Sequence, residues 1–243
     1  MQYLILSDIH GNLEALQAVL EAAPEVDEVI CLGDLVGYGA SPNEVIEHLS
    51  RQQHLTVIRG NHDKVAAGIE SGDQFNNDAL QAAIWTKEQL SSENREFLAQ
   101  LSSGPCSIHG HFEIAHGSPI HEDQYIFDPL SAQEAFQHLE TDLCFFGHTH
   151  IPVIFFRPSD GAVRLFGPPE GEPFVLEPGQ YLINPGSVGQ PRDRDGRASF
   201  VIYDEDAGSI TYHRVSYDLE NAQEKIRAAG LPPFLAARLE SGM

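Results

Sequence analysis

The sequence predicts an α/β protein that begins with a parallel sheet. Three strand-loop-helix units follow one another at the N-terminal end, where the spacing of apolar residues changes from that of a strand to that of a helix in each unit. After Gly104 the apolar residues mostly alternate, which indicates a strand-rich second half. Hydrophobic residues make up 42% of the 243 residues, which is sufficient for a buried core.

The three N-terminal units place their loops on one side of the predicted sheet. Consecutive units of this kind give parallel strands with right-handed crossovers, and ligands collect at the carboxyl ends of such strands. Ser41 is a good N-cap and Pro42 a good first residue for the second helix. The strands are expected at 3–7, 28–32 and 54–58, and the helices at 13–23, 42–51 and beyond residue 63.

The segment 73–101 is expected to be helical, with Trp85 packed between two helices. We expect one domain over residues 1–243, in which this segment is a cap-like insertion that lies near the site or serves the structure alone. Residues 167–179 are rich in Pro, Gly and Glu and are expected to form a loop. The remaining helices are expected at 79–90, 93–101, 131–139 and 218–229, and the strands at 106–108, 112–115, 143–146, 153–157, 162–166, 180–184, 199–204 and 209–215.

The charge and the hydropathy pattern exclude some classes of function. A formal net charge of −22 argues against a protein that grips long nucleic acid by its phosphates. The chain has no apolar run of the roughly 18 residues that a membrane span needs, and Met1 leads directly into a strand. We therefore expect a cytoplasmic protein without a membrane partner, and the sequence leaves its oligomeric state open.

Several potential metal ligands follow the predicted strands. An Asp-x-His pair at the end of an extended segment places both side chains on one face, because side chains alternate along a strand. Oxygen and nitrogen ligands without a thiolate suit Mn, Fe, Co, Ni or Zn. One ion takes four to six ligands, so this number of candidates predicts two ions with a shared ligand, although Asp34 alone is more commonly a turn or cap residue. The candidates are Asp8, His10, Asp34, Asn61, His62, His116, His148 and His150.

The order and spacing of these residues resemble those of the calcineurin-like metallophosphoesterases. The segment 184–192, together with Gly37-Tyr38-Gly39, is similar to the compact bacterial, phosphodiesterase-type members. The resemblance covers roughly residues 3–204, and it implies a four-layer α-β-β-α sandwich of two mixed sheets flanked by helices. The matching motifs are Asp8-x-His10, Gly33-Asp34, Gly60-Asn61-His62-Asp63, His116 and Gly147-His148-x-His150.

The same resemblance implies a role for each ligand. Asp8, His10 and His150 would bind the first divalent or trivalent ion, and Asn61, His116 and His148 would bind the second. Asp34 would bridge the two ions. A hydroxide held between the ions would attack the phosphorus in line. We also expect Asp63 to hold a protonated His62, which would protonate the leaving oxygen as a catalytic acid.

Three further residues are candidates for substrate contact. Arg192 lies in a Gly/Pro/Asp loop and has the guanidinium that suits phosphate, while Arg59 binds substrate or holds its own loop in place. Asn12 stands next to the first metal motif and either positions substrate or packs. His109-Gly110-His111 is expected to be a hairpin turn that points away from the site.

These observations predict a metal-dependent phosphoesterase that acts on a small phosphate ester, with a phosphodiester or nucleotide favoured. Phosphomonoesters, including phosphoproteins, use the same core in the resembling family and remain alternatives. A non-catalytic metal-binding scaffold is the alternative from another class. A scaffold would usually have lost ligands, whereas this chain retains all of them.

Overall fold

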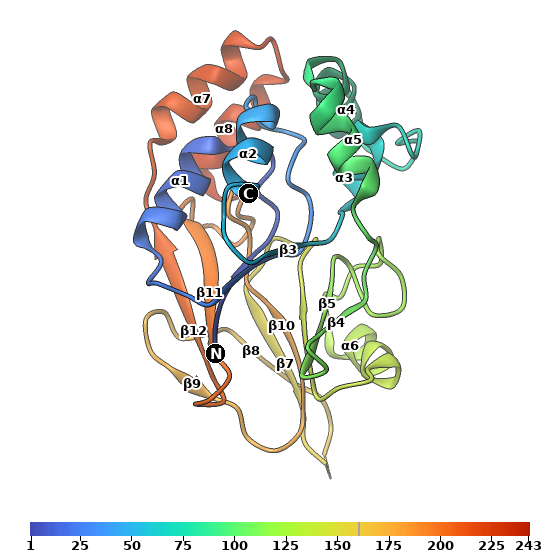
Figure 1. Ribbon diagram of the computed structural model, residues 1–243, viewed down its shortest axis with the longest axis vertical. Coiled ribbons are helices and arrows are strands. Elements are labelled where there is room, and N and C mark those ends of the chain that lie inside the picture. The colour runs from blue at the N-terminus through green and yellow to red at the C-terminus, as the bar shows by residue number, and fades with distance from the viewer. Residues whose placement is uncertain (160) are drawn as a thin grey trace.

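The computed structural model describes residues 1–159 and 161–243, which form two six-stranded mixed sheets (Figure 1). The first sheet has the strand order β3-β2-β1-β11-β12-β9. Its first three strands are parallel, as predicted, and the others are antiparallel to their neighbours. The strands are β1 (Gln2–Leu6), β2 (Glu28–Cys31), β3 (Leu55–Val57), β9 (Phe174–Val175), β11 (Ala198–Asp204) and β12 (Ser209–Val215).

The second sheet has the order β4-β5-β6-β10-β7-β8. Strands β5, β6 and β10 are parallel, and antiparallel strands flank them on both sides. Strand β9 lies inside the expected loop 167–179, and β8 begins two residues later than predicted. The strands are β4 (Cys106–Ile108), β5 (Phe112–Ala115), β6 (Leu143–Phe146), β7 (Val153–Arg157), β8 (Arg164–Phe166) and β10 (Gln180–Asn184).

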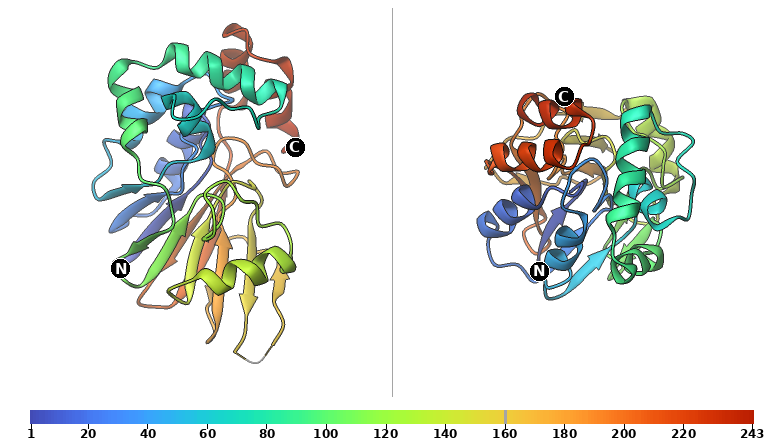
Figure 2. Two further views of the ribbon diagram at one scale, coloured as in Figure 1. Left: turned by 90° about the vertical axis from the view of Figure 1, so that its right-hand side faces the viewer. Right: turned by 90° about the horizontal axis from the view of Figure 1, so that it is seen from above.

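Alternation along the strands produces the layers. In β1, Tyr3 and Ile5 pack into a cluster that joins the two sheets, whereas Leu4 and Leu6 face the helices on the outside. The outer face of the first sheet is covered by α1 (Leu13–Ala22) and α2 (Pro42–Leu49), and that of the second by α6 (Pro129–Ala135). The four-layer sandwich of two mixed sheets flanked by helices is thus confirmed (Figures 1 and 2).

The remaining helices gather at the upper end of the molecule in Figure 1. Helix α4 packs with α7 and α8 in one apolar cluster, and the three lie next to one another when the molecule is seen from above (Figure 2). Trp85 of α4 belongs to this cluster, so the prediction that it packs between α4 and α5 is wrong. The helices are α3 (Asn61–Ala67), α4 (Asn77–Gln89), α5 (Ser92–Gln100), α7 (Leu219–Ala228) and α8 (Pro233–Ser241).

Helix α8 was missing from the expected elements. Gly230 has a φ of +69° and ends α7, but Pro233 then occupies the first turn of a further helix, where its missing N–H costs nothing. Helix α6 begins at Pro129, earlier than predicted, because Asp128 caps it and accepts the backbone N–H of Leu130 and Ser131. None of the helices in the described residues is long and apolar enough to cross a membrane.

Candidate metal centre

The segments after β1, β2, β3, β5 and β6 bring the predicted ligands together between the ends of the two sheets. Several of these residues have left-handed backbone conformations, with φ of 54° at Asp8, 50° at His10, 54° at Asp34, 67° at His148 and 60° at His150. Strand alternation therefore does not explain why Asp8 and His10 converge, since both lie beyond the end of β1. Such strained conformations in non-glycine residues are concentrated at functional sites.

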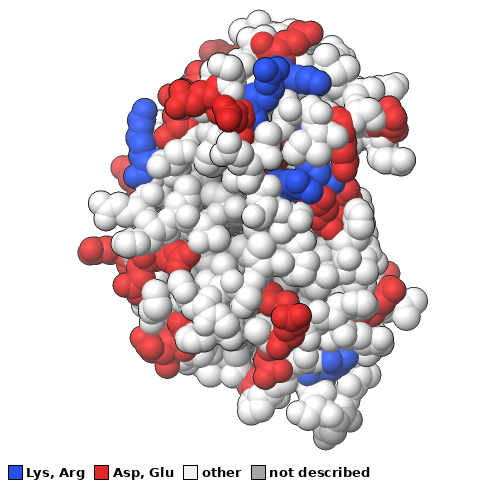
Figure 3. Space-filling model, turned by 45° about the vertical axis from the view of Figure 1, so that its right-hand side comes forward, with Lys and Arg blue, Asp and Glu red and all other residues white. Residues whose placement is uncertain are grey.

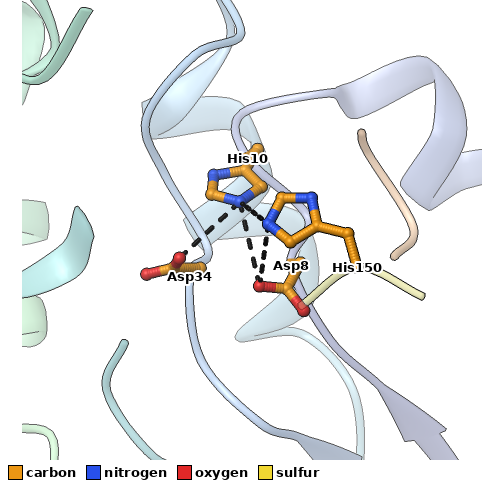
Figure 4. A group of neighbouring side chains, drawn as sticks. All are labelled: Asp8, His10, Asp34 and His150. Carbon is orange, nitrogen blue, oxygen red and sulfur yellow. Dashed lines mark hydrogen bonds and ion pairs between the residues drawn. The ribbon is translucent and has the colours of Figure 1, made fainter. Parts of the chain in front are cut away.

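One group of side chains is Asp8, His10, Asp34 and His150, all of them buried (Figure 4). Nε2 of His10 lies 3.1 Å from Nε2 of His150, 3.6 Å from Oδ2 of Asp34 and 3.8 Å from Oδ1 of Asp8. Nε2 of His150 lies 3.3 Å from the same Asp8 oxygen. Four possible ligand atoms thus surround one point.

A second group consists of Asp34, His116 and His148. Nε2 of His116 lies 3.4 Å from Oδ2 of Asp34 and 3.2 Å from the side-chain oxygen of Asn61. The ring of His148 is 4.8 Å from that of His116. Asp34 belongs to both groups, and the same oxygen, Oδ2, faces His10 in one and His116 in the other.

Backbone carbonyls fix the orientation of three of the imidazoles. Nδ1 of His10 donates to the carbonyl of Val36, and Nδ1 of His150 donates to that of Gln190. Because Nδ1 carries the proton in each neutral ring, Nε2 presents a lone pair. Two such lone pairs face each other 3.1 Å apart, an arrangement that a shared cation would stabilise. His116 is held in the same way by the carbonyl of Leu32.

The two aspartates are held by one oxygen each. Oδ2 of Asp8 accepts the hydroxyl of Ser7 and the backbone N–H of His148, whereas Oδ1 is buried without a hydrogen-bond partner in the described part of the chain. Oδ1 of Asp34 accepts the backbone N–H of His62, which leaves Oδ2 for the site. An unpaired buried carboxylate oxygen is costly without a cation, so these residues fit a metal centre.

The pKa shifts differ among the potential ligands, and burial raises the pKa of Asp8 to about 6. Burial lowers the pKa of His10, His148 and His150 well below the ordinary value. Burial also lowers the pKa of His116, but the charge of Asp34 and its contact with the ring outweigh this and raise it to about 10. A proton on His116 therefore compensates Asp34 where a cation would otherwise do so.

Two glycines, by having no side chain, make room for the carboxylates of the two aspartates. A Cβ on Gly60 would stand 2.1 Å from Oδ1 of Asp34, and a Cβ on Gly147 would stand 2.0 Å from the hydroxyl of Ser7 and 3.0 Å from Oδ2 of Asp8. Both glycines have ordinary backbone angles. Their role is therefore close approach of the backbone to the carboxylates.

The predicted pairing of His62 with Asp63 is wrong. Both oxygens of Asp63 accept backbone N–H groups, one from Val36 and one from Gly60, so this carboxylate holds two loops together. His62 packs against Tyr38 and Phe75, with ring centroids 4.4 Å away in each case. Its Nδ1 is buried and has no hydrogen-bond partner among the described residues. The side chains of neighbouring residues on a helix point in different directions, which explains why His62 and Asp63 do not pair.

Two of the three candidates for substrate contact, Arg59 and Asn12, make structural contacts instead, which is the alternative stated for each of them. Arg59 donates two hydrogen bonds of 3.0 Å to the carboxylate of Glu122 and so ties its own loop to residues 116–128. Asn12 caps α1 by accepting the N–H of Ala15 and donates to the carbonyl of Gly189. Both side chains are occupied by structural contacts.

Arg192, by contrast, lies at the site. It lines a small pocket of about 100 Å³ together with Asp34, His62 and His150, and its guanidinium contacts Gln190 and the hydroxyl of Tyr38. No carboxylate in the described residues forms an ion pair with it. A cation in this position is suited to a phosphate oxygen.

Two aromatic residues at the site were missed by the sequence analysis. The ring of Tyr125 stacks on His148 with centroids 3.8 Å apart and an angle of 19°, and Phe75 packs on His62. The polar loop 118–128 contains Tyr125 and Phe127. Two aromatic residues in a polar loop are the sequence signal that points to Tyr125 as a site residue. The histidines 109 and 111 lie at the β4–β5 hairpin, as predicted, where they contact Glu28 and Glu205.

Comparisons with known proteins agree with this geometry. Residues 1–208 match the model of the calcineurin-like phosphoesterase superfamily domain. The crystal structure of a metallophosphoesterase from Sphaerobacter thermophilus has 42% sequence identity and a TM-score of 0.89, and the match covers 100% of this chain and 99% of that one. An uncharacterised protein of Methanocaldococcus jannaschii is 41% identical over 247 residues, which cover 98% of this chain and 97% of the relative. The phosphodiesterase YfcE of Escherichia coli K12 is 28% identical over 221 residues, which cover 86% and 91%.

Proposed function

Because the chain belongs to the calcineurin-like phosphoesterase superfamily, we propose that it is a dinuclear metal-dependent hydrolase of small phosphate esters, with phosphodiesters or nucleotides favoured. The observation that carries the proposal is the position of Asp34, whose Oδ2 belongs to two groups of potential ligands. The name of the YfcE relative supports the choice of diesters.

In this proposal Asp8, His10 and His150 would hold one ion, and Asn61, His116 and His148 would hold the other, as the distances allow. Asp34 would serve as a ligand in both groups. Two such ions would supply Lewis-acid activation of the attacking water and neutralise charge on the phosphate oxygens. Nitrogen and oxygen ligands without a thiolate suit Mn, Fe, Co, Ni or Zn.

The side chains of the protein itself orient the phosphate and stabilise the leaving oxygen. Arg192 binds a non-bridging oxygen of the phosphate, because it faces the pocket and has no carboxylate partner in the described residues. His62 lines the same pocket, where burial lowers the pKa of its imidazole to about 4, so its neutral ring donates a hydrogen bond to the leaving oxygen. Hydrolysis breaks one P–O ester bond, forms one P–O bond to water and releases an alcohol and a phosphomonoester.

We further propose that residues 1–243 are one domain and that the segment 73–101 is a cap over the site. Its N-terminal end supports this, since Phe75, Asn76 and Ala79 line the pocket that contains Asp34 and Arg192. Helix α5, at the other end of the segment, contributes Leu98 to the core of the first sheet. The cap therefore reaches from the core to the substrate side of the pocket.

The test is hydrolysis by metal-free protein to which Mn, Fe, Co, Ni or Zn is added singly. We expect no turnover without metal and faster cleavage of bis(p-nitrophenyl) phosphate than of p-nitrophenyl phosphate with it. Faster cleavage of the monoester would reassign the substrate class. No hydrolysis of either ester with any of the metals would overturn the proposal in favour of a non-catalytic scaffold.

A further inference from the structure

A cavity of about 710 Å³ adjoins the metal centre on one side. It has room for a nucleoside-sized group, since ligand pockets usually measure about 300–1,000 Å³. The residues that line both the cavity and the small pocket at the metal centre are Asn61, Gln74, Phe75, Tyr125 and His148. An ester whose phosphorus lies at the metal centre can therefore place one of its organic groups in this cavity.

The wall of the cavity nearest the metal centre is aromatic. Tyr125 is 42% exposed although its ring stacks on His148, and Phe127 stacks on Tyr125 at 4.9 Å. Phe75 and Val65 add further apolar surface. Stacking on His148 and Phe127 fixes the position of Tyr125. Aromatic walls of this kind bind flat, unsaturated rings.

The other side of the cavity is polar and carries carboxylates. Glu70, Asp73 and Asp123 line it, and no Lys or Arg among the described residues does. Lys64 bonds Glu70 and Asp123 from beneath, but its side chain is only 1% exposed. Its ammonium compensates the charge of these two carboxylates. Asp73 is exposed and forms no ion pair within the described residues.

The distribution of charge around the metal centre is thus unequal. Among the described residues, Arg192 is the one arginine or lysine that lines the pocket at the metal centre. It does not line the adjoining cavity. Acidic residues cover more of the face in Figure 3 than basic residues do, and the formal net charge of the chain is −22. A second phosphate on the substrate would be repelled from the cavity.

We propose that this cavity is a specificity subsite for an aromatic organic group of the ester that carries no phosphate of its own, such as a nucleoside. The proposal rests on the phosphoesterase function proposed above and specifies its substrate class. Aromatic residues 75 and 125 bind the base, and Asp73, whose carboxylate has no ion pair in the described residues, rejects nucleotides with a further phosphate on that group.

Three esters that release the same p-nitrophenolate test the subsite. They are methyl p-nitrophenyl phosphate, thymidine 5′-(p-nitrophenyl phosphate) and the latter compound with an added 3′-phosphate. In each case water attacks phosphorus and the P–O bond to p-nitrophenolate breaks, so the methyl group or the nucleoside stays on the phosphate. We expect kcat/KM to be about 10-fold or more higher for the thymidine ester than for the methyl ester. The 3′-phosphate should remove that advantage.

Two substitutions with matched controls locate the effect. Phe75→Leu should reduce the preference for the thymidine ester mainly through KM, whereas Phe234→Leu, an exposed phenylalanine on α8, should leave it unchanged. Asp73→Lys should restore cleavage of the 3′-phosphorylated ester about 10-fold. Glu88→Lys makes the same change of charge on α4 outside the cavity and should not.

A binding measurement separates the subsite from catalysis. Metal-free protein should broaden the NMR resonances of adenosine, and Phe75→Leu should abolish this while Phe234→Leu does not. Equal kcat/KM for all three esters, or a Glu88→Lys effect equal to that of Asp73→Lys, would overturn the subsite and leave the phosphoesterase function standing. No turnover of any ester with any metal would overturn both.

Discussion

Oδ2 of Asp34 lies 3.4 Å from Nε2 of His116, although Asp34 follows a strand of the first sheet and His116 follows a strand of the second. The same oxygen lies 3.6 Å from Nε2 of His10. The two sheets therefore meet at one carboxylate. A change at Asp34, or at a residue that supports it, should affect both proposed ions.

Gly60→Ala should weaken metal binding without replacing a ligand. The new Cβ would stand 2.1 Å from Oδ1 and 2.5 Å from the backbone nitrogen of Asp34, so the carboxylate must move. We expect a loss of affinity of about 10- to 100-fold, as is typical when the support of a ligand is disturbed. Metal titration would measure it. Gly167→Ala is the control, because a Cβ there meets nothing within 4 Å; equal affinities in the two variants would contradict the close-approach argument.

His62→Ala and Asp63→Asn should have different effects. We expect His62→Ala to lower kcat by about 10²- to 10⁴-fold with metal content unchanged. Asp63→Asn should instead lower the free energy of unfolding by about 1–3 kcal/mol, because an amide accepts only one of the two N–H groups that Asp63 now satisfies. Denaturant unfolding and steady-state kinetics measure both. A loss of kcat in Asp63→Asn as large as in His62→Ala, at unchanged stability, would restore the rejected pairing.

Arg192→Gln should lower kcat/KM by about 10-fold or more, which corresponds to the loss of one charge-assisted hydrogen bond to phosphate. Arg59→Gln is the matched control. Its ion pair with Glu122 is structural and partly exposed, so we expect a stability change of about 1 kcal/mol or less and an unchanged kcat/KM. Equal kinetic losses in the two variants would show that the choice between the arginines is wrong.

Metal binding should depend on pH. In the metal-free protein burial lowers the pKa of His116, but Asp34 raises it to about 10, so the ring is protonated near neutral pH. Binding through Nε2 must displace this proton, and raising the pH removes the competition. We therefore expect proton release on metal addition in weak buffer and an affinity that rises between pH 6 and 8. An affinity independent of pH would show that His116 is not a ligand.

Much of the fold followed from the sequence because its signals are local. The parallel strands β1, β2 and β3 were predicted from their apolar runs and the loops between them. Helix α8 was missed because Gly230 and Pro232 mark the end of α7. Pro233, which follows them directly, looks like part of the same helix-breaking segment although it starts the next helix.

The sequence predicted which residues form the site but not how their side chains are arranged. The ordered ligands indicated convergence, yet the left-handed backbone of Asp8 and His150 depends on contacts from other loops. The adjacency of His62 and Asp63 suggested a pair, but consecutive helical residues do not face each other. Tyr125 lies far along the chain from Phe75, and only tertiary structure brings both to the same cavity.

The most direct test of the account is the number of metal ions bound per chain, measured by mass spectrometry of purified and metal-loaded protein. We expect two ions in the natural sequence, about one after His150→Ala, and fewer than one after Asp34→Ala, because Asp34 belongs to both groups of ligands. A single ion in the natural sequence, or an Asp34→Ala variant that keeps two, would contradict the shared carboxylate.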